Sequence, residues 1–205
     1  MQFLITVKEN LSPGRLLVFA FTILYTAGAG FYFASIGNTE FLGYIAVIVA
    51  LLILGGCVLT HQCVPVWLFA LVSSVGFLHL LGAAMPVGDD ILYNYVPFPI
   101  ESSTGLTFIK MDQIVHTYGS AVAALLAYFF LRRDTEFRTF GLLVFTILAA
   151  SGVGALNEVI EFTAKLLVPN TDVGGYYNTA LDLVVNTFGA ALGALGAVMF
   201  WKRAA

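Results

Sequence analysis

Residues 142–156 read LLVFTILAASGVGAL and contain no charged residue. A second uncharged stretch covers Leu42–Leu59. Strands of a membrane β-barrel alternate polar and apolar residues over about ten positions. These two runs are continuous instead, and a helix that crosses the bilayer needs about 20 mostly apolar residues. The two stretches therefore predict an all-α protein embedded in a membrane.

The composition of the whole chain supports the same class. Of 205 residues, 60% are hydrophobic and 10% are charged, whereas roughly a quarter of the residues in an ordinary soluble domain are charged. These values exclude a soluble globular protein and a disordered chain. The net charge of -3 offers no basic surface to nucleic acid, and two cysteines are too few for a disulfide scaffold. We therefore expect membrane lipids, and no nucleic acid, as partners.

Six stretches are long and apolar enough to span the bilayer, so we expect residues 1–205 to form a single transmembrane domain, a bundle of six helices. The expected spans lie near Leu16–Ser35, Phe41–Thr60, Val64–Met85, Met111–Leu131, Phe140–Val168 and Thr179–Trp201. The one long connection, residues 86–110, is expected to be an interfacial loop on the outer side. Residues 1–14 lack the basic start and small-residue cleavage site of a signal peptide, so the first span is expected to be retained.

Basic residues in short loops set the orientation of a membrane protein. If both termini are cytoplasmic, seven Lys and Arg residues lie on the inner side and two, Lys110 and Lys165, lie on the outer side. Six spans also require both termini on one side. The sequence therefore predicts that the N and C termini are cytoplasmic.

Ionisable and amide side chains within the expected spans are the main candidates for function. A charged side chain at the centre of a membrane helix costs about 2.5–3.5 kcal/mol of insertion free energy, so such residues are seldom present without a role. With the predicted orientation they all fall toward the outer ends of four spans. The residues are His79 on the third span, Asp112 and His116 on the fourth, Glu158 and Glu161 on the fifth, and Asp182 and Asn186 on the sixth.

Helical spacing predicts that these residues share faces. The pairs on the last three spans are separated by three or four positions, so each pair lies on one side of its helix. Each pair also continues a stripe of small residues, such as Gly189 and Gly193 after Asn186, and small residues mark the seams where membrane helices approach closely. We expect the acids to point into such a seam, away from lipid.

Four carboxylates in one helix seam repel one another and lose their hydration, so their negative charge must be neutralised or solvated. Protonation of some acids, a metal ion, or water with a cationic or hydrogen-bonding ligand would each supply it. Carboxylates with imidazole suit Zn, Mn or iron, and carboxylates alone suit Mg or Ca. The chain lacks the Glu-x-x-His and His-Glu-x-x-His patterns of well-known metal sites. The plainer interpretation is that these residues are hydrogen-bonding contacts between packed helices.

Two further features are weaker candidates. Cys57, His61 and Cys63 could be metal ligands at the inner end of the second span, but a fourth ligand is missing nearby, and a buried Cys pair with an interfacial His is the better interpretation. Asn157 lies about 100° around the helix from Glu158. It is expected to be a helix contact or a partner of the acids.

Three segments resemble, in the same order, motifs of the YjdF-type family of membrane proteins of unknown function and, more distantly, of VanZ-like proteins. The segments are DQIVHTYG at 112–119, NEVIEF at 157–162 and YNTALDLVVNTFGA at 177–190. The chain departs at Gln113, where relatives often carry a basic residue. The resemblance implies a shared polar site in a prokaryotic inner (cytoplasmic) membrane. VanZ-like proteins are associated with glycopeptide resistance, which points to lipids or envelope precursors.

Three hypotheses follow. The first is a metal-dependent hydrolase or transferase that acts on a lipid or lipid-linked head group. In it Asp112, His116, Glu158 and Asp182 would bind a divalent ion (Zn, Mn or Mg), Glu161 would be the general base toward water, and Asn186 and His79 would orient or polarise the substrate. The second is a proton- or cation-coupled transporter or binding protein that uses the same carboxylates. The third is a structural membrane protein with polar helix contacts.

Overall fold

The computed structural model describes residues 12–61, 64–101, 107–134, 136–168, 171 and 174–201. The chain divides into two compact units, Met1–Pro86 and Val87–Ala205. The expected single transmembrane domain over 1–205 stays a prediction.

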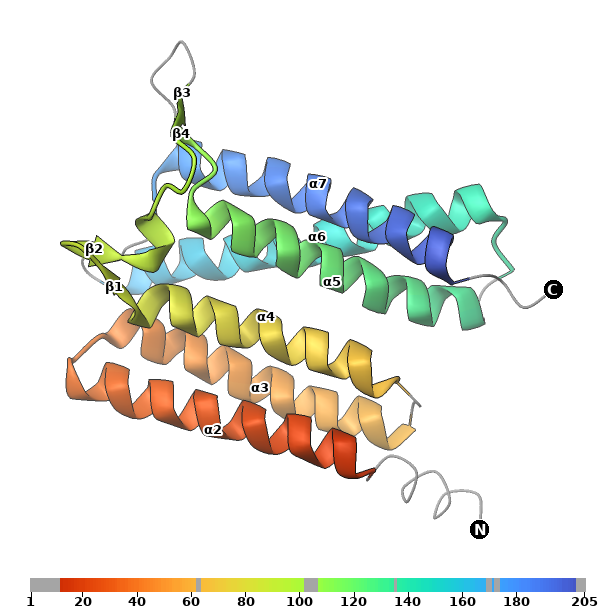
Figure 1. The fold of residues 1–205 in the computed structure, drawn as a ribbon, viewed down its shortest axis with the longest axis horizontal. Coiled ribbons are helices and arrows are strands. Elements are labelled where there is room, and N and C mark those ends of the chain that lie inside the picture. Colours follow the sequence, from red (N-terminus) through yellow and green to blue (C-terminus); the bar gives the residue numbers. More distant parts are fainter. Residues whose placement is uncertain are drawn as a thin grey trace. The chain divides into compact units, whose positions relative to one another are not determined.

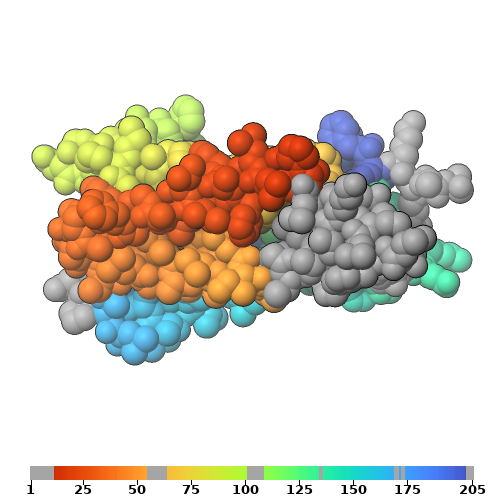
Figure 2. All heavy atoms as spheres, turned by 90° about the horizontal axis from the view of Figure 1, so that it is seen from below, coloured from red at the N-terminus to blue at the C-terminus, as the bar shows by residue number. Residues whose placement is uncertain are grey.

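The described part of the first unit, from residue 12 on, contains the helices α2 (Pro13–Ser35), α3 (Thr39–His61) and α4 (Val66–Ala84). Helix α2 packs against both of the others (Figure 1). Proline at the first helical position starts α2 at little cost, because its missing N–H has no partner there in any helix. Figure 2 shows this unit with α2 in red beside α3 in orange.

Polar and apolar faces of α2 are clearly separated. Leu17, Leu24 and Phe31 recur at seven-residue intervals and are 71%, 70% and 81% exposed, which is the pattern of a lipid-facing stripe. On the opposite side the hydroxyls of Thr22 and Ser73 lie 2.6 Å apart and join α2 to α4. Such hydrogen bonds between membrane helices contribute about 0.6–2 kcal/mol each.

The second unit contains α5 (Met111–Asp134), α6 (Thr139–Leu167) and α7 (Tyr176–Phe200), and each of these helices packs against the other two (Figure 1). Their shared core is built from small side chains, with Ala124, Ala150, Ala190 and Ala194 fully buried. A Cβ atom at Gly189 would overlap the backbone of Thr117. The predicted close seam along the small-residue stripe of α7 is therefore present.

The connection before α5 contains short elements rather than a plain loop. These are β1 (Pro86–Val87), β2 (Asp90–Ile91), a 3-10 helix η1 (Leu92–Asn94), β3 (Ile100–Glu101) and β4 (Thr107–Phe108). Strands β1 and β2 form one two-stranded sheet. Strands β3 and β4 form another, which is antiparallel and pairs Ile100 with Phe108.

Among the residues that the structure describes, five helices are long and apolar enough to cross a membrane by length and composition, namely α2, α4, α5, α6 and α7. Helix α3 occupies the second expected span, and the apolar part of it whose side chains are described, Thr39–Leu54, is shorter than the others. The structure therefore supports a multi-pass membrane protein. The exact number of six spans and the side on which the termini lie stay predictions.

Candidate metal centre

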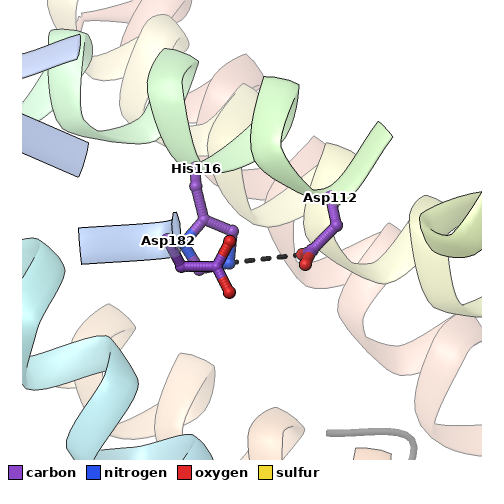
Figure 3. A group of neighbouring side chains, drawn as sticks. All are labelled: Asp112, His116 and Asp182. Carbon is purple, nitrogen blue, oxygen red and sulfur yellow. Dashed lines mark ion pairs between the residues drawn. The ribbon is translucent and has the colours of Figure 1, made fainter. Parts of the chain in front are cut away.

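His116 lies at the centre of a polar cluster formed by the three helices of the second unit. It stands on α5 one turn after Asp112, while Glu158 and Glu161 come from the last third of α6, and Asp182 comes from the first third of α7. Figure 3 shows Asp112, His116 and Asp182, with the Asp182 carboxylate beside the imidazole ring. The three helices thus bring together side chains that are up to 70 residues apart in the chain, as between His116 and Asn186.

One side of the imidazole faces two carboxylates. Nε2 of His116 lies 3.3 Å from Oδ1 of Asp112, the pair marked in Figure 3, and 3.6 Å from Oε1 of Glu161. Asp182 belongs to the same surroundings, because ligand atoms of Asp112, His116 and Asp182 all lie within 4.8 Å of one another.

The other side of the imidazole faces a carboxylate and an amide. Nδ1 of His116 lies 3.3 Å from Oε1 of Glu158 and 3.4 Å from Nδ2 of Asn186. The same amide nitrogen of Asn186 donates to Oε1 of Glu158 at 3.4 Å. His116 therefore has a different polar partner on each ring nitrogen.

Burial of the polar side chains in this cluster costs free energy. Asp182 is 0% exposed, Asn186 is 2% exposed and Glu158 is 5% exposed. Oε2 of Glu158 and Oδ1 of Asp182 are buried without a hydrogen-bond partner among the described residues. A buried carboxylate oxygen without a donor loses its hydration and gains nothing in return. These two oxygens are therefore open acceptors for a proton or for a ligand.

The spacing of the ligand atoms fits a metal ion. Charge-assisted N–H···O bonds are about 2.7–2.9 Å long, and all three contacts of His116 with carboxylates are longer than this, at 3.3–3.6 Å. Metal–ligand bonds of about 2.0–2.6 Å place two ligands of one ion between about 3 and 5 Å apart, depending on their angle. Two sets fall in this range, Asp112 with His116 and Asp182, and His116 with Glu158 and Glu161.

Three amide or hydroxyl groups support the cluster from outside. Asn157 donates to Oε1 of Glu161 at 2.7 Å, so its expected role as a partner of the acids is confirmed. Asn178 donates to Oδ2 of Asp182 at 2.6 Å. Ser120 donates to Oδ1 of Asn186 at 2.7 Å. Asn178 is the residue that the sequence analysis missed, although its spacing of four positions from Asp182 was a usable signal.

Gln113 has a structural role at the start of α5. Its Oε1 accepts hydrogen bonds from the backbone N–H groups of Ile109, at 2.6 Å, and Lys110, at 3.2 Å. A side chain at the third helical position that reaches back to the residue before the helix is one half of a capping box. Gln113 thus fixes the turn that leads directly into Asp112.

His79 belongs to the first unit and lies on α4. Its ring packs edge-on against Tyr44, with the ring centroids 5.7 Å apart. The hydroxyl of Tyr44 donates to Oε1 of the buried Glu40 at 3.3 Å. The role expected for His79 toward a substrate stays a prediction. The weaker metal prediction on Cys57, His61 and Cys63 lies outside the side chains that the structure describes.

Comparison with known proteins identifies the family but supplies no function. Neither the comparison with curated proteins nor that with solved structures gives a match. The model of one family, described as "Predicted membrane protein (DUF2238)", matches residues 16–203 and thus both helical units. The chain belongs to this DUF2238 family of predicted membrane proteins.

Proposed function

We propose that the cluster around His116 binds a divalent metal ion and that the protein is a metal-dependent enzyme, a hydrolase or transferase for the head group of a membrane lipid or lipid-linked envelope molecule. The observation that carries the proposal is the fully buried carboxylate of Asp182, whose Oδ1 has no partner among the described residues and which lies within ligand distance of Asp112 and His116. A Zn, Mn or Mg ion is the kind of ligand that such oxygens accept.

The contacts favour Asp112, Asp182 and Nε2 of His116 as the ligands. A histidine that binds a metal through one nitrogen usually donates its other N–H to a carboxylate or carbonyl, which fixes the ring. Glu158, 3.3 Å from Nδ1, fits that second role. We therefore assign Glu158 to orienting His116, whereas the sequence alone favoured it as a direct ligand.

Glu161 is the best candidate for the general base. Its side chain is 14% exposed, more than that of Glu158 at 5%, and it lies at the edge of the cluster. Asn157 holds one oxygen of Glu161, which leaves the second oxygen to take a proton from water. A base beside an ion that polarises the substrate is the basic arrangement for hydrolysis of an ester or phosphodiester.

The position of the cluster along the helices supports a substrate at the membrane surface. Asp112 is the second residue of α5, and Asp182 is the seventh of α7. At 1.5 Å per residue the cluster lies within roughly 10 Å of one end of these helices. Tyr176 and Tyr177, 81% and 64% exposed, stand at that same end of α7, as aromatic residues do at a membrane interface.

This depth favours the enzyme over the transporter. Binding sites of secondary transporters lie near the bilayer midplane, whereas a site near one helix end is at the level of lipid head groups. The more distant VanZ-like resemblance points to the same class of substrate. We further propose that both termini face the cytoplasm of a prokaryotic cell. At the end of α5 away from the cluster, Arg132 lies over the ring of Trp201, 4.4 Å from its centroid, a basic and aromatic pair suited to the inner interface.

Metal binding is tested first. Detergent-purified protein is loaded with Zn²⁺, Mn²⁺ or Mg²⁺, washed and examined by elemental analysis and calorimetry. We expect one equivalent of a preferred ion in the wild type and loss of that ion in Asp182→Asn. Asp89→Asn is the matched control, because it makes the same change at an exposed residue of the connection. A wild type that binds no ion, or an Asp182→Asn variant that binds it equally, would refute the metal site.

The reaction is tested separately. The metal-loaded protein is reconstituted with bacterial lipid extract, and head-group release is followed by mass spectrometry. We expect a metal-dependent product that is lost in Glu161→Gln and kept in Glu136→Gln, an exposed glutamate between α5 and α6. No product from metal-loaded wild type would argue against this enzyme class, and proton or cation flux above empty vesicles would favour the transporter instead.

A further inference from the structure

Three arginines lie at the end of the second unit away from the proposed metal centre. Arg132 and Arg133 stand in the last turn of α5, and Arg138 directly precedes α6. The end of α5, the start of α6 and the end of α7 meet there in one buried cluster (Figure 1). Its members are Tyr128, Leu142 and Ala197. The packing of the three helices thus brings the arginines to one end of the unit.

Aromatic side chains hold Arg132 in place. Its guanidinium lies over the ring of Trp201, 4.4 Å from the centroid. The Trp201 ring is stacked in turn on that of Tyr128, which is 2% exposed. The cation–π contact uses the face of the guanidinium, whereas the N–H donors point outward in its plane, in the fork that matches a phosphate. Arg132 is therefore preorganised for a bidentate contact with a phosphate.

Arg133 rests on the same aromatic group. Its guanidinium lies 5.3 Å from the ring centroid of Phe129, and that ring packs 5.8 Å from Trp201. Arg133 and Arg138 are both exposed. Among the side chains that the structure describes, none forms an ion pair with any of the three arginines. Their charge is thus open to an anionic partner.

The sequence at this end is basic as a whole. Residues 132–138 and 202–203 contain five basic residues, and two acidic ones, Asp134 and Glu136. Basic clusters beside the ends of membrane helices attract anionic phospholipids. The excess of positive charge therefore favours a ligand with an anionic head group.

Exposed apolar side chains next to the arginines favour a lipid over free phosphate. Phe140, at the start of α6, is 77% exposed, and Met199 and Phe200, at the end of α7, are 73% and 89% exposed. Acyl chains would cover these side chains, whereas inorganic phosphate would leave them in contact with water. A phospholipid with an anionic head group meets both requirements.

We propose that Arg132, Arg133 and Arg138 form a binding site for an anionic phospholipid. Arg132, held on Trp201, binds the phosphate through two N–H groups, and the other two arginines attract the head group. Arg132 follows Asp112 by 20 residues on α5, which corresponds to about 30 Å along the helix axis. The lipid bound here is therefore distinct from any substrate of the proposed metal centre.

Tryptophan fluorescence tests the site directly, because the chain has two tryptophans and Trp67→Phe leaves Trp201 as the sole one. This variant is reconstituted in phosphatidylcholine vesicles with increasing amounts of phosphatidylglycerol brominated on its acyl chains, and quenching is compared with that by brominated phosphatidylcholine. We expect brominated phosphatidylglycerol to quench Trp201 at a lower mole fraction. Excess inorganic phosphate should not reverse this quenching, because the ligand is the lipid.

Substitutions in the Trp67→Phe background identify the groups that bind. Arg132→Gln and Arg133→Gln should each lower the preference for phosphatidylglycerol about fivefold. Arg132→Lys should also lower it, because an ammonium group lacks the planar fork of a guanidinium. The matched control is Lys110→Gln, which removes one positive charge just before the opposite end of α5. Since Arg133 is exposed, its variant tests the site even if Arg132→Gln fails to fold.

Two results would overturn the inference. One is equal quenching of Trp201 by the two brominated lipids. The other is an equal loss of preference in Lys110→Gln and Arg133→Gln, because net charge alone would then explain the effect. An unchanged preference in Arg132→Lys would refute the bidentate contact assigned to Arg132.

Discussion

The backbone N–H of Ile109 donates to Oε1 of Gln113, and Ile109 itself has a φ angle of 63°, in the left-handed region. A β-branched residue is rarely found in this conformation, which costs an L-residue roughly 1–2 kcal/mol. The hydrogen bond holds the turn in place just before the first turn of α5. Gln113 directly follows Asp112 in the chain, and the strained Ile109 lies three residues before it.

Replacement of Gln113 tests this capping contact. In Gln113→Ala two backbone N–H groups lose their acceptor, and we expect the free energy of unfolding to fall by about 1–2 kcal/mol in a denaturant titration in detergent. Gln113→Glu is the control, because it keeps the accepting oxygen, while Nε2 of Gln113 has no partner among the described residues. Equal stability of wild type and Gln113→Ala would contradict the capping role.

Gly193 and Gly196 on α7 offer a matched pair for the seam with α5. A Cβ atom at Gly193 would overlap the backbone carbonyl of Ala121, whereas nothing lies within 4 Å of one at Gly196. Gly193→Ala should destabilise the protein by about 1–3 kcal/mol, because a rigid backbone must move. Gly196→Ala should be neutral or slightly stabilising, since alanine favours helix. Similar melting temperatures of the two variants would show that the helices do not meet this closely.

Removal of metal should lower stability if the site binds an ion in the folded protein. At a free zinc concentration of 100 times Kd, bound metal adds about 2.7 kcal/mol to the free energy of unfolding. We expect a chelator to lower the melting temperature of zinc-loaded wild type and to leave that of Asp182→Asn unchanged. A chelator effect of the same size in both proteins would place the metal elsewhere.

Asp90, in the connection before α5, gives a prediction on pH. Its carboxylate accepts hydrogen bonds from Asn94, at 2.9 Å, and from the backbone N–H of Ile91, at 2.7 Å, and these bonds lower the pKa of Asp90 below its usual 3.8. The depressed pKa means that the stabilising contribution is present above pH 3.8 and is lost as the pH falls through the folded-state pKa. In Asn94→Ala the pKa of Asp90, measured by NMR titration, should rise toward 3.8. An unchanged pKa would exclude Asn94 as the main cause.

Helix positions and the convergence of the acids were accessible from sequence because both depend on regular geometry. Uninterrupted apolar runs predicted the helices, and spacings of three or four residues predicted which side chains share a face. The direction of each helix then predicted that Asp112, Glu158 and Asp182 meet near one end of their helices. The structure brings these side chains together around His116.

The remaining features depend on details that spacing does not contain. The sixth span was expected to begin at Thr179, but α7 begins at Tyr176, so Asn178 lies within the helix and reaches Asp182. Hydropathy could not reveal this, because the first turn of α7 is polar and aromatic. The role of Gln113 depends on a left-handed residue at Ile109, which isoleucine gives no reason to expect. The choice between the two nitrogens of His116 depends on side-chain rotamers.

Helix α7 lies closest to α5 at Gly189, so a tilt of α7 around this contact would move the side chain of Asp182. Seven residues separate the two positions, which corresponds to about 10 Å along the helix axis. A tilt of about 5° around the glycine contact would move the carboxylate by about 1 Å over that lever arm. In the proposed metal site, a displacement of this size would break a metal–ligand bond, whose length varies by only about 0.2 Å. The glycine contact, about 10 Å from Asp182, would thus limit how accurately that carboxylate is placed in the proposed site.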